Sequence, residues 1–366
     1  MNKAKKVIAK SALSLIFLIS LNVAASPDTT IHPNDIAKFI SGLEPGVSSP
    51  LYNLTKSKNW QRHSKAFDSA WDRVEAAKLK EARIWTKKTF TKSEDTMFYM
   101  FSGPDYLYAD TFFPNAKTYI LTGLEPVGRV SNIGKLPTRT LNYSLVQLRQ
   151  SLNTVLSYSF FITKRMKSEL RTGFQGTLPI ILVFMARTGK KIHDISYVTL
   201  KKDGTLEPFV AENSRQTPAA VKITFNRSGG EMQTLYYFST DLANYGVRRS
   251  GFLKYCEKLG RGDSLVKSAS YLMHLSSFSA VRDFLLKNSS TILQDDSGIP
   301  IRHFARDQWG LHLHGRYYGP ISLFAKHYQR DLQRLYRKSK PERVKFGIGY
   351  RWRTHETNFL LARKKI

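Results

Sequence analysis

The sequence predicts an α/β protein with a mixed, largely parallel sheet, flanking helices, and a C-terminal helix plus β-hairpin. A strand–helix–strand pattern in residues 98–128 predicts two parallel strands joined by a right-handed crossover. A looser copy of that pattern covers residues 268–300. Strict alternation of apolar residues from Val344 to Trp352, followed by Phe359 and Leu361, predicts the closing hairpin.

The first strand–helix–strand unit is the clearest part of the pattern. Residues 97–101 are continuously apolar, as in a strand that is buried on both faces. Residues 106–113 suit a short helix that ends before Pro114, and residues 118–121 suit the second strand. In the second copy, Tyr271–Met273 takes the place of the first strand and Thr291–Leu293 that of the second.

The chain divides into a signal peptide at 1–25, an N-terminal helical segment at 26–95 and an α/β domain at 96–366. Within this domain, 96–210 and 219–366 are candidate βαβ-containing halves. The helical segment shows an apolar stripe at helical spacing, which predicts a helix packed on the sheet. This stripe consists of Trp60, Phe67, Trp71 and Val74.

The middle of the chain alternates between helical and strand patterns. Helices are predicted at 143–171 and 178–185. Two antiparallel hairpins are predicted around short polar turns. Their strands are 195–200 with 205–210, and 221–225 with 234–238. Near the C-terminus, Gly319 and Pro320 precede a helical apolar stripe that reaches Tyr336.

The first 25 residues match a secretory signal, so we expect the chain to be exported to the periplasm or secreted. Four lysines precede an apolar run at 12–21, and small residues follow at 23–25. The apolar run is shorter than the roughly 20 residues of a permanent anchor. An uncleaved N-terminal anchor is the alternative. No further transmembrane segment is expected after the signal is removed.

The charge of the chain favours anionic partners. Lys and Arg number 57 against 28 Asp and Glu, which gives a net charge of +29. An anionic envelope polymer, a membrane surface or nucleic acid would suit this excess, although high charge can also be a general trait of exported proteins. Residues 330–366 hold twelve basic and three acidic residues. The predicted anion-binding residues are Arg337, Lys338, Lys340, Arg343, Arg351 and Arg353.

A second set of candidates comes from scarce acids at the expected strand ends. Ligands of open α/β sheets bind beyond the carboxyl ends of the strands, where the strand order reverses. Carboxylates there can hydrogen-bond sugar hydroxyls, bind a cation or transfer protons. The predicted catalytic residues are Asp105, Glu125, Asp295 and Asp296, with His274 as general base. Ordinary turn or cap residues are the alternative for each acid.

Other signals of chemistry are weak. His312 and His314 would share a strand face, but spacing fixes no third ligand for a catalytic zinc, so no metal site is predicted. The single cysteine, Cys256, excludes an internal disulfide and lies in a helical pattern. The common hydrolase, kinase and dinucleotide motifs are absent from the sequence, and it indicates no cofactor.

Two short runs, FSGPDYLYADTFFP and LQDDSGIP, resemble stretches of an uncharacterised family of exported bacterial proteins with no assigned activity. The resemblance implies a location but no mechanism. Two functional hypotheses therefore remain. The chain binds an anionic envelope ligand or polymer through its basic surface, or it is a periplasmic enzyme whose acidic site acts on a sugar or a phosphate-containing compound.

Overall fold

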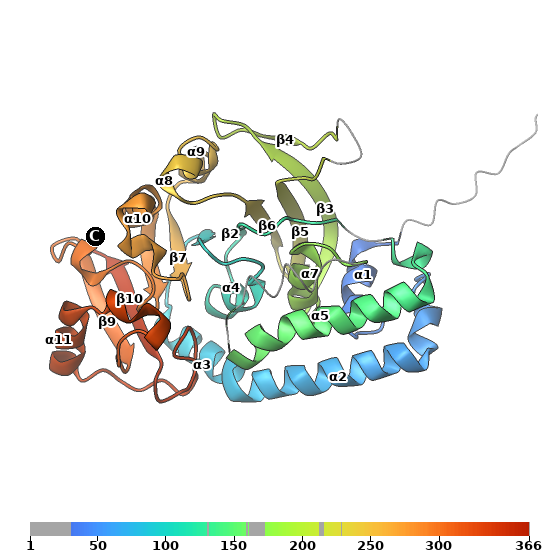
Figure 1. Cartoon of the computed structure of the whole chain (residues 1–366), viewed down its shortest axis with the longest axis horizontal. Helices are drawn as coiled ribbons and strands as arrows, with labels where there is room; N and C mark the ends of the chain where they lie inside the picture. Colours follow the sequence, from blue (N-terminus) through green and yellow to red (C-terminus); the bar gives the residue numbers. More distant parts are fainter. Residues whose placement is uncertain are drawn as a thin grey trace, which may run out of the picture. The chain divides into compact units, whose positions relative to one another are not determined.

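A single mixed sheet of ten strands lies at the centre of the described part of the chain (Figure 1). The structure is a computed structural model and describes residues 31–129, 132–158, 160, 173–211, 216–227 and 229–365. Residues Ile31–Ile366 form one compact unit. The predicted signal at 1–25 lies outside the described residues.

The strand order in the sheet is β4-β3-β5-β6-β2-β1-β7-β8-β10-β9. The five central strands, in the order β6-β2-β1-β7-β8, run parallel to one another. The remaining pairs on both sides are antiparallel. The strands are β1 (Thr96–Tyr99), β2 (Thr118–Gly123), β3 (Lys190–Leu200), β4 (Leu206–Pro208), β5 (Ala220–Arg227), β6 (Met232–Ser239), β7 (Gly262–Val266), β8 (Ser289–Gln294), β9 (Trp309–Gly315) and β10 (Asn358–Lys364).

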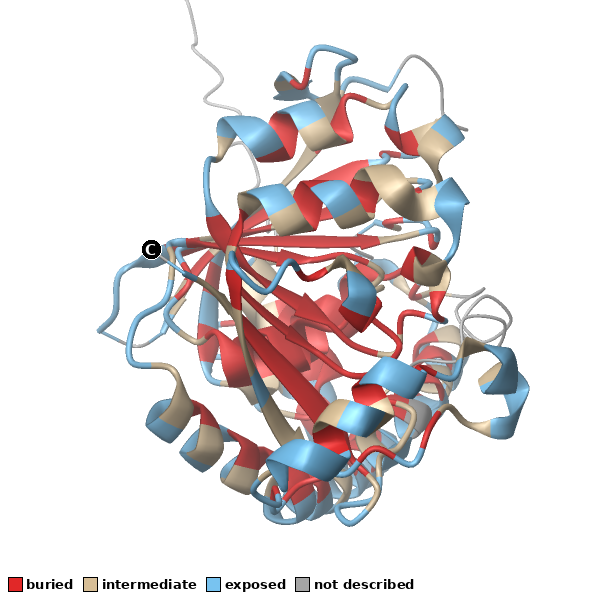
Figure 2. Ribbon diagram, turned by 90° about the vertical axis from the view of Figure 1, so that its left-hand side faces the viewer, coloured by how far each residue is buried: buried red, intermediate tan, exposed pale blue. Residues whose placement is uncertain are grey.

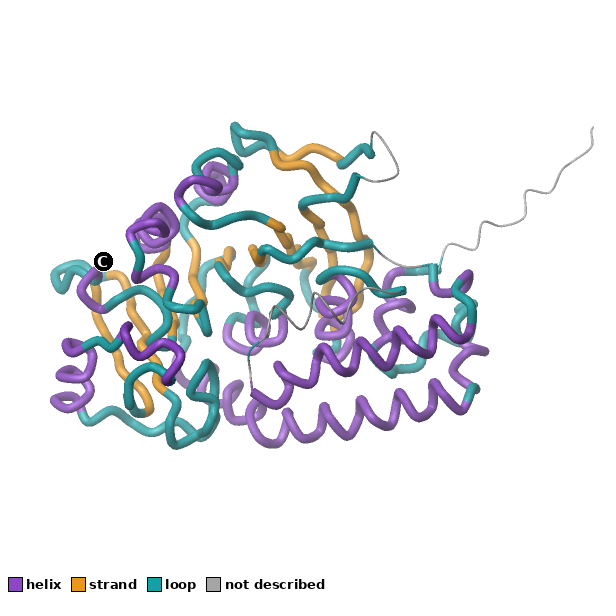
Figure 3. Tube along the Cα trace, viewed as in Figure 1, coloured by secondary structure: helices purple, strands orange, loops and turns teal. Residues whose placement is uncertain are grey.

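Helices cover both faces of the sheet, and this confirms the predicted α/β class (Figure 3). One face packs against α1 (Pro33–Ile40), α2 (Lys58–Val74), α3 (Lys80–Thr89), α4 (Tyr106–Phe112), α5 (Thr138–Tyr158) and α7 (Leu178–Arg187). The other face packs against α8 (Asn244–Val247), α9 (Phe252–Lys258), α10 (Ser279–Asn288) and α11 (Arg330–Ser339). Between α2 and α3 lies one π-helical turn, Glu75–Leu79.

Alternation along the central strands divides the core into two apolar layers. Met97 and Tyr99 point into the layer under α4 and α7, whereas Phe98 and Met100 point into the layer under α10. The central strands are buried along their length, and the outer helices expose only their outward faces (Figure 2). This burial on both faces explains why β1 is a continuous apolar run.

The first predicted crossover unit is confirmed. β1, α4 and β2 follow one another, and the two strands pair in parallel with Phe98 opposite Ile120. The second unit also exists, as β7, α10 and β8. Its first strand, however, is Gly262–Val266. The predicted strand Tyr271–Met273 is wrong, because Tyr271 has a left-handed backbone and residues 272–274 form a 3-10 turn.

The C-terminal region contains a helix and an antiparallel strand pair, as predicted, but the residues that form them differ from those predicted. The helical stripe is split into a 3-10 segment, η7 (Ser322–His327), and α11. The closing antiparallel pair is β9 with β10. The segment 344–352, predicted as its first strand, is a loop. Val344, Phe346 and Ile348 are buried in the core without strand pairing, and Gly349 has a φ of +73°, which no strand allows.

The remaining predictions agree with the structure at coarse level. The hairpins β3–β4 and β5–β6 are antiparallel, and residues 178–187 form a buried helix. The predicted helix at 143–171 corresponds to α5, and residues 161–171 lie outside the described residues. None of the helices in the described part of the chain combines the length and apolarity that crossing a bilayer requires.

Candidate functional site

A cavity of about 280 Å³ opens at the carboxyl ends of the parallel strands. Within the sheet, β2 lies on one side of β1, and β7 and β8, which come later in the chain, lie on the other side. The strand order therefore reverses between β1 and β7. The loops that follow β1, β2, β6 and β7 all line the cavity. This position is the one at which open α/β sheets bind their ligands. We refer to it as the switch-point cavity.

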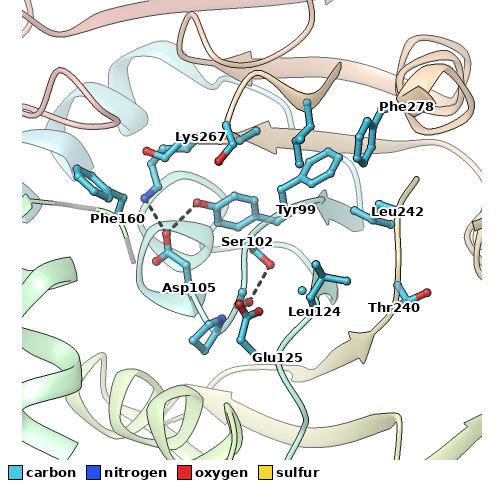
Figure 4. Close-up of a pocket in the computed structure, with 18 of the residues that line it drawn as sticks. Tyr99, Ser102, Asp105, Leu124, Glu125, Phe160, Thr240, Leu242, Lys267 and Phe278 are labelled. Atoms are coloured by element: carbon cyan, nitrogen blue, oxygen red, sulfur yellow. Dashed lines mark hydrogen bonds and ion pairs between the residues drawn. The ribbon is translucent and has the colours of Figure 1, made fainter. Parts of the chain in front are cut away.

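Asp105 forms a buried network at one end of the switch-point cavity (Figure 4). Its carboxylate accepts a hydrogen bond from the Tyr99 hydroxyl at 2.8 Å and pairs with the Lys267 ammonium at 2.8 Å. It also caps α4 by accepting from the Tyr108 amide at 3.3 Å. Lys267 is itself buried and lies over the Tyr108 ring. Burial raises the pKa of Tyr99, which keeps its hydroxyl protonated as a donor.

Glu125 follows β2 and lines the same cavity. Only 7% of the residue is exposed. Its backbone carbonyl accepts a hydrogen bond from Tyr237 at 2.9 Å, but its carboxylate has no hydrogen-bond or ion-pair partner among the described residues. The carboxylate lies against Gly123, where a Cβ atom would collide with it. Gly123 therefore makes room for a carboxylate that only a ligand or solvent can satisfy.

Asp295 and Asp296 follow β8 and lie at the same edge of the sheet, but they face the protein interior. Asp295 accepts from the amides of Ser268 and Ser297, each at 3.0 Å. Asp296 accepts from the Tyr271 hydroxyl at 2.7 Å and from the Asn358 amide group at 3.1 Å. Burial raises the pKa of both carboxyls, that of Asp296 to about 6. Both therefore act in holding the loop after β7.

His274 lies in the 3-10 turn after β7 and does not line the switch-point cavity. Its ring packs edge-on against Tyr271 and His327. Burial, together with the nearby His327 and Arg302, lowers the pKa of His274 to about 4. The structure thus brings Asp105 and Glu125 together in one cavity. Asp295 does not line this cavity but hydrogen-bonds to Ser268, which does. Asp296 and His274 lie outside the cavity lining.

Backbone strain is concentrated at this cavity. Among the described residues, five non-glycine residues have a positive φ, and four of them are Phe101, Ser268, Ser270 and Tyr271. The first three line the cavity directly. Such conformations cost about 1–3 kcal/mol each and persist where the surrounding structure fixes them, often at functional sites. No pattern in the sequence indicates this strain.

Several cavity residues were missed by the sequence analysis. Lys267 and Ser268 follow β7 directly, and they were overlooked because the strand was expected a few residues later. Asp241 follows β6, and its carboxylate accepts from the Ala243 amide at 2.9 Å. Tyr350 comes from the loop that was predicted to be a strand. Lys267 and Ser268 would have been recognised as cavity residues if the strand had been placed at Gly262–Val266.

The predicted anion-binding residues separate into two groups. Four of them are exposed on the end of α11 and the following loop, namely Arg337, Lys338, Lys340 and Arg343. The other two serve the fold: Arg351 donates to the carbonyls of Gly319 and Pro320, and Arg353 pairs with Glu356.

Metal-type clusters do not occur in the described part of the chain, since no group of three His, Cys, Asp or Glu residues converges there. His314 packs edge-on against Trp85 at 5.1 Å, and Cys256 is buried with a raised pKa because burial disfavours the thiolate. No family model matches this chain, and no curated protein or solved structure matches it either. The functional argument therefore rests on the geometry of the switch-point cavity.

Proposed function

We propose that the chain binds a sugar- or nucleoside-type ligand without phosphate groups in the switch-point cavity. The carboxylate of Glu125 carries the proposal. It belongs to a residue that is only 7% exposed, borders the cavity and has no partner among the described residues. In doubly wound α/β folds, an acid after the second strand binds the hydroxyls of a ribose. We assign this role to Glu125.

The charge of the cavity argues against a phosphate. Among the described residues, three carboxylates line it, those of Asp105, Glu125 and Asp241, against one ammonium, that of Lys267, which already pairs with Asp105. The start of the first crossover helix is where a phosphate usually binds. Here the carboxylate of Asp105 occupies that position as the cap of α4. A neutral or cationic ligand is therefore favoured over the phosphate-containing compounds that the sequence left open.

The two ends of the cavity differ in polarity (Figure 4). Leu124, Leu242 and Phe278 form an apolar end, where a flat ring can pack. Asp105 and Lys267 form the charged end, and Glu125 lies between the two (Figure 4). This order of groups suits a base, a ribose and a polar substituent on the ribose. Adenosine is the simplest probe that carries the first two.

Glu125→Gln should weaken adenosine binding about 10–100-fold, because charge-assisted hydrogen bonds to a diol contribute about 1.5–3 kcal/mol each. Isothermal titration calorimetry of the full chain with adenosine, AMP and ATP measures this. In the binding that Glu125→Gln weakens, wild type should prefer adenosine to AMP, and AMP to ATP, since each phosphate adds repulsion from Asp105 and Glu125.

The matched control is Glu231→Gln. Glu231 is exposed and precedes β6, so it lies at the opposite, amino-terminal edge of the parallel strands. That variant should bind adenosine like wild type. The proposal fails if adenosine does not bind saturably, or if Glu125→Gln and Glu231→Gln behave alike. Tighter binding of ATP than of adenosine that is weakened by Glu125→Gln would contradict the phosphate-free assignment alone.

A second candidate function is binding of an anionic envelope polymer, and the exposed basic group on α11 favours it. Arg337, Lys338, Lys340 and Arg343 have no ion-pair partner among the described residues. Replacing all four with Gln should weaken binding to a polyphosphate probe, and wild-type binding should fall steeply as salt is raised. Equal binding by the variant and wild type at low salt would reject this surface.

We also propose that the chain functions outside the cytoplasm. The support comes from the sequence, in which lysines, an apolar run and small residues follow one another over residues 1–25. A high positive charge suits an envelope location, because anionic polymers and lipid head groups lie there.

A further inference from the structure

A second hollow, of about 300 Å³, lies beside the switch-point cavity and shares none of its lining residues. It is bounded by the 3-10 turn η6 (Ile301–His303), by the end of η7 and by the start of α11. His274 closes it on the side of the loop after β7. We call this hollow the η6–α11 pocket.

Three cations surround the η6–α11 pocket, and each comes from a different element. Arg302 lies in η6, Lys326 in η7 and Arg330 in α11. None of the three has an ion-pair partner among the described residues. Asp331 is the one acid among the described residues that line the pocket, and it pairs with Arg334 at 3.1 Å. The pocket is therefore strongly electropositive, in contrast to the acidic switch-point cavity.

The start of α11 adds to this positive potential. The helix has ten residues, and no side chain caps its N-terminus. Its N-cap residue, Gln329, instead accepts from the Ile301 amide at 2.9 Å and donates to the Asp296 carbonyl at 3.1 Å. Arg330, the first residue of the helix, therefore lies at the positive end of the helix dipole, where a cation is unfavourable; Asp331 in the same turn offsets part of this charge, but its carboxylate also pairs with Arg334. An anion between the helix start and the cations would remove this conflict.

Two histidines complete the wall of the pocket. The rings of His274 and His327 meet edge to face at 5.2 Å. The Nε2 atom of His274 is buried and has no hydrogen-bond partner among the described residues. Burial lowers the pKa of both rings, and Arg302 and Lys326 add to the shift at His274 and His327 respectively. Both lowered pKa values agree with an excess of positive charge around the pocket that its lining residues do not balance.

We propose that the η6–α11 pocket is a binding site for a tetrahedral oxyanion, namely the phosphate group of a small ligand. Arg302, Lys326 and Arg330 supply three positive charges from three elements around one pocket, and this excess of charge suits a dianion better than a singly charged carboxylate. The site goes beyond the proposed function, because it is separate from the switch-point cavity and takes ligands of the opposite charge.

Arg302→Gln and Arg330→Gln should each weaken phosphate binding about tenfold, because each removes charge-assisted hydrogen bonds. The full chain is titrated with inorganic phosphate and with glycerol 3-phosphate at constant ionic strength, with acetate as the planar comparison. Binding is followed by calorimetry and by the NMR signals of the histidine rings. Wild type should bind both phosphates saturably and more tightly than acetate.

Arg73→Gln is the matched control, because Arg73 is an exposed arginine in the last turn of α2, on the other face of the sheet, and does not line the η6–α11 pocket. It should leave phosphate binding unchanged, and thermal unfolding of all variants checks that each is folded. Tighter binding of glycerol 3-phosphate would identify an esterified phosphate as the ligand, and tighter binding of the inorganic ion would identify free phosphate. Absence of saturable binding, or equal losses in Arg73→Gln and Arg330→Gln, would overturn the site.

Discussion

Asp105→Asn should lower the free energy of unfolding by about 3–5 kcal/mol, because it removes the carboxylate that balances a buried ammonium. The Asp105 and Lys267 side chains are each 2% exposed, and the two charged groups are 2.8 Å apart. Asparagine has one side-chain oxygen, so it can keep either the α4 cap, which uses Oδ1, or the acceptor for Tyr99 and Lys267, which is Oδ2, and the variant loses one acceptor together with the charge. Urea unfolding at neutral pH measures the difference from wild type.

Two further variants isolate the cause. Adding Lys267→Met to Asp105→Asn should recover most of the lost stability, because a buried ion pair can often be replaced by apolar side chains at little net cost. Asp331→Asn removes the carboxylate of an exposed pair with Arg334 and should change stability by less than about 1 kcal/mol. A loss below 1 kcal/mol for Asp105→Asn would mean that the pair does not anchor the cavity.

The sequence could predict the part of the fold whose burial leaves a simple pattern. β1 is apolar from Met97 to Tyr99 because both of its faces are covered, and α4 ends before Pro114, so the β1–α4–β2 unit could be recognised. From that unit, the positions of Asp105 and Glu125 at one edge of the sheet follow directly. The sequence alone is therefore enough to predict that Asp105 and Glu125 line the same cavity.

β7 could not be recognised because its buried side chains are partly polar. Ser264 shares a hydrogen bond of 2.6 Å with Ser289, and Asp263 accepts from the Glu94 amide at 2.8 Å. These partners lie 25 and 169 residues away along the chain, so no local pattern indicates that the strand is buried. The missed strand led to the misplaced start of the second crossover unit, and Lys267 was overlooked with it.

The loop at 344–352 shows the opposite error. Its apolar residues alternate and are buried, which is the pattern of a half-buried strand. The backbone instead turns at Gly349, where a Cβ atom would collide with the Asp295 carboxylate. Alternating burial therefore occurs here without strand pairing. The sequence could not reveal this, because the constraint comes from a residue 54 positions earlier in the chain.

The sequence also could not rank the four acids at the strand ends. Glu125 and Asp295 both follow an apolar strand and precede a turn. They differ only in their surroundings, since Asp295 accepts three hydrogen bonds from Ser268 and Ser297 while the Glu125 carboxylate faces the switch-point cavity. Hydrogen-bond partners distant in sequence thus decide which acid remains available to a ligand.

His63 should make the protein lose stability as the pH falls from 6.5 toward 3. Its Nε2 donates to the Ile40 carbonyl at 2.9 Å, and its Nδ1 faces the Arg149 guanidinium at 2.7 Å, so the buried ring is held neutral. Burial, with Arg149 and Arg187 adding to it, lowers its pKa from 6.5 to about 3. The unfolded chain then binds more protons than the folded one between these values, and stability rises with pH there.

The stabilisation from His63 is therefore complete above pH 6.5, and about 2.5–3 kcal/mol of it is lost by pH 4.5. Urea unfolding of wild type and of His63→Gln at pH 7 and pH 4.5 measures this loss, because glutamine can hydrogen-bond at the same position without titrating. Wild type should lose about 2.5 kcal/mol more than His63→Gln over that interval, whereas replacement of the exposed His355 should leave the wild-type pH dependence intact. Parallel losses in wild type and His63→Gln would show that His63 takes up its proton without unfolding the packing between α2 and α5, which lie side by side (Figure 1).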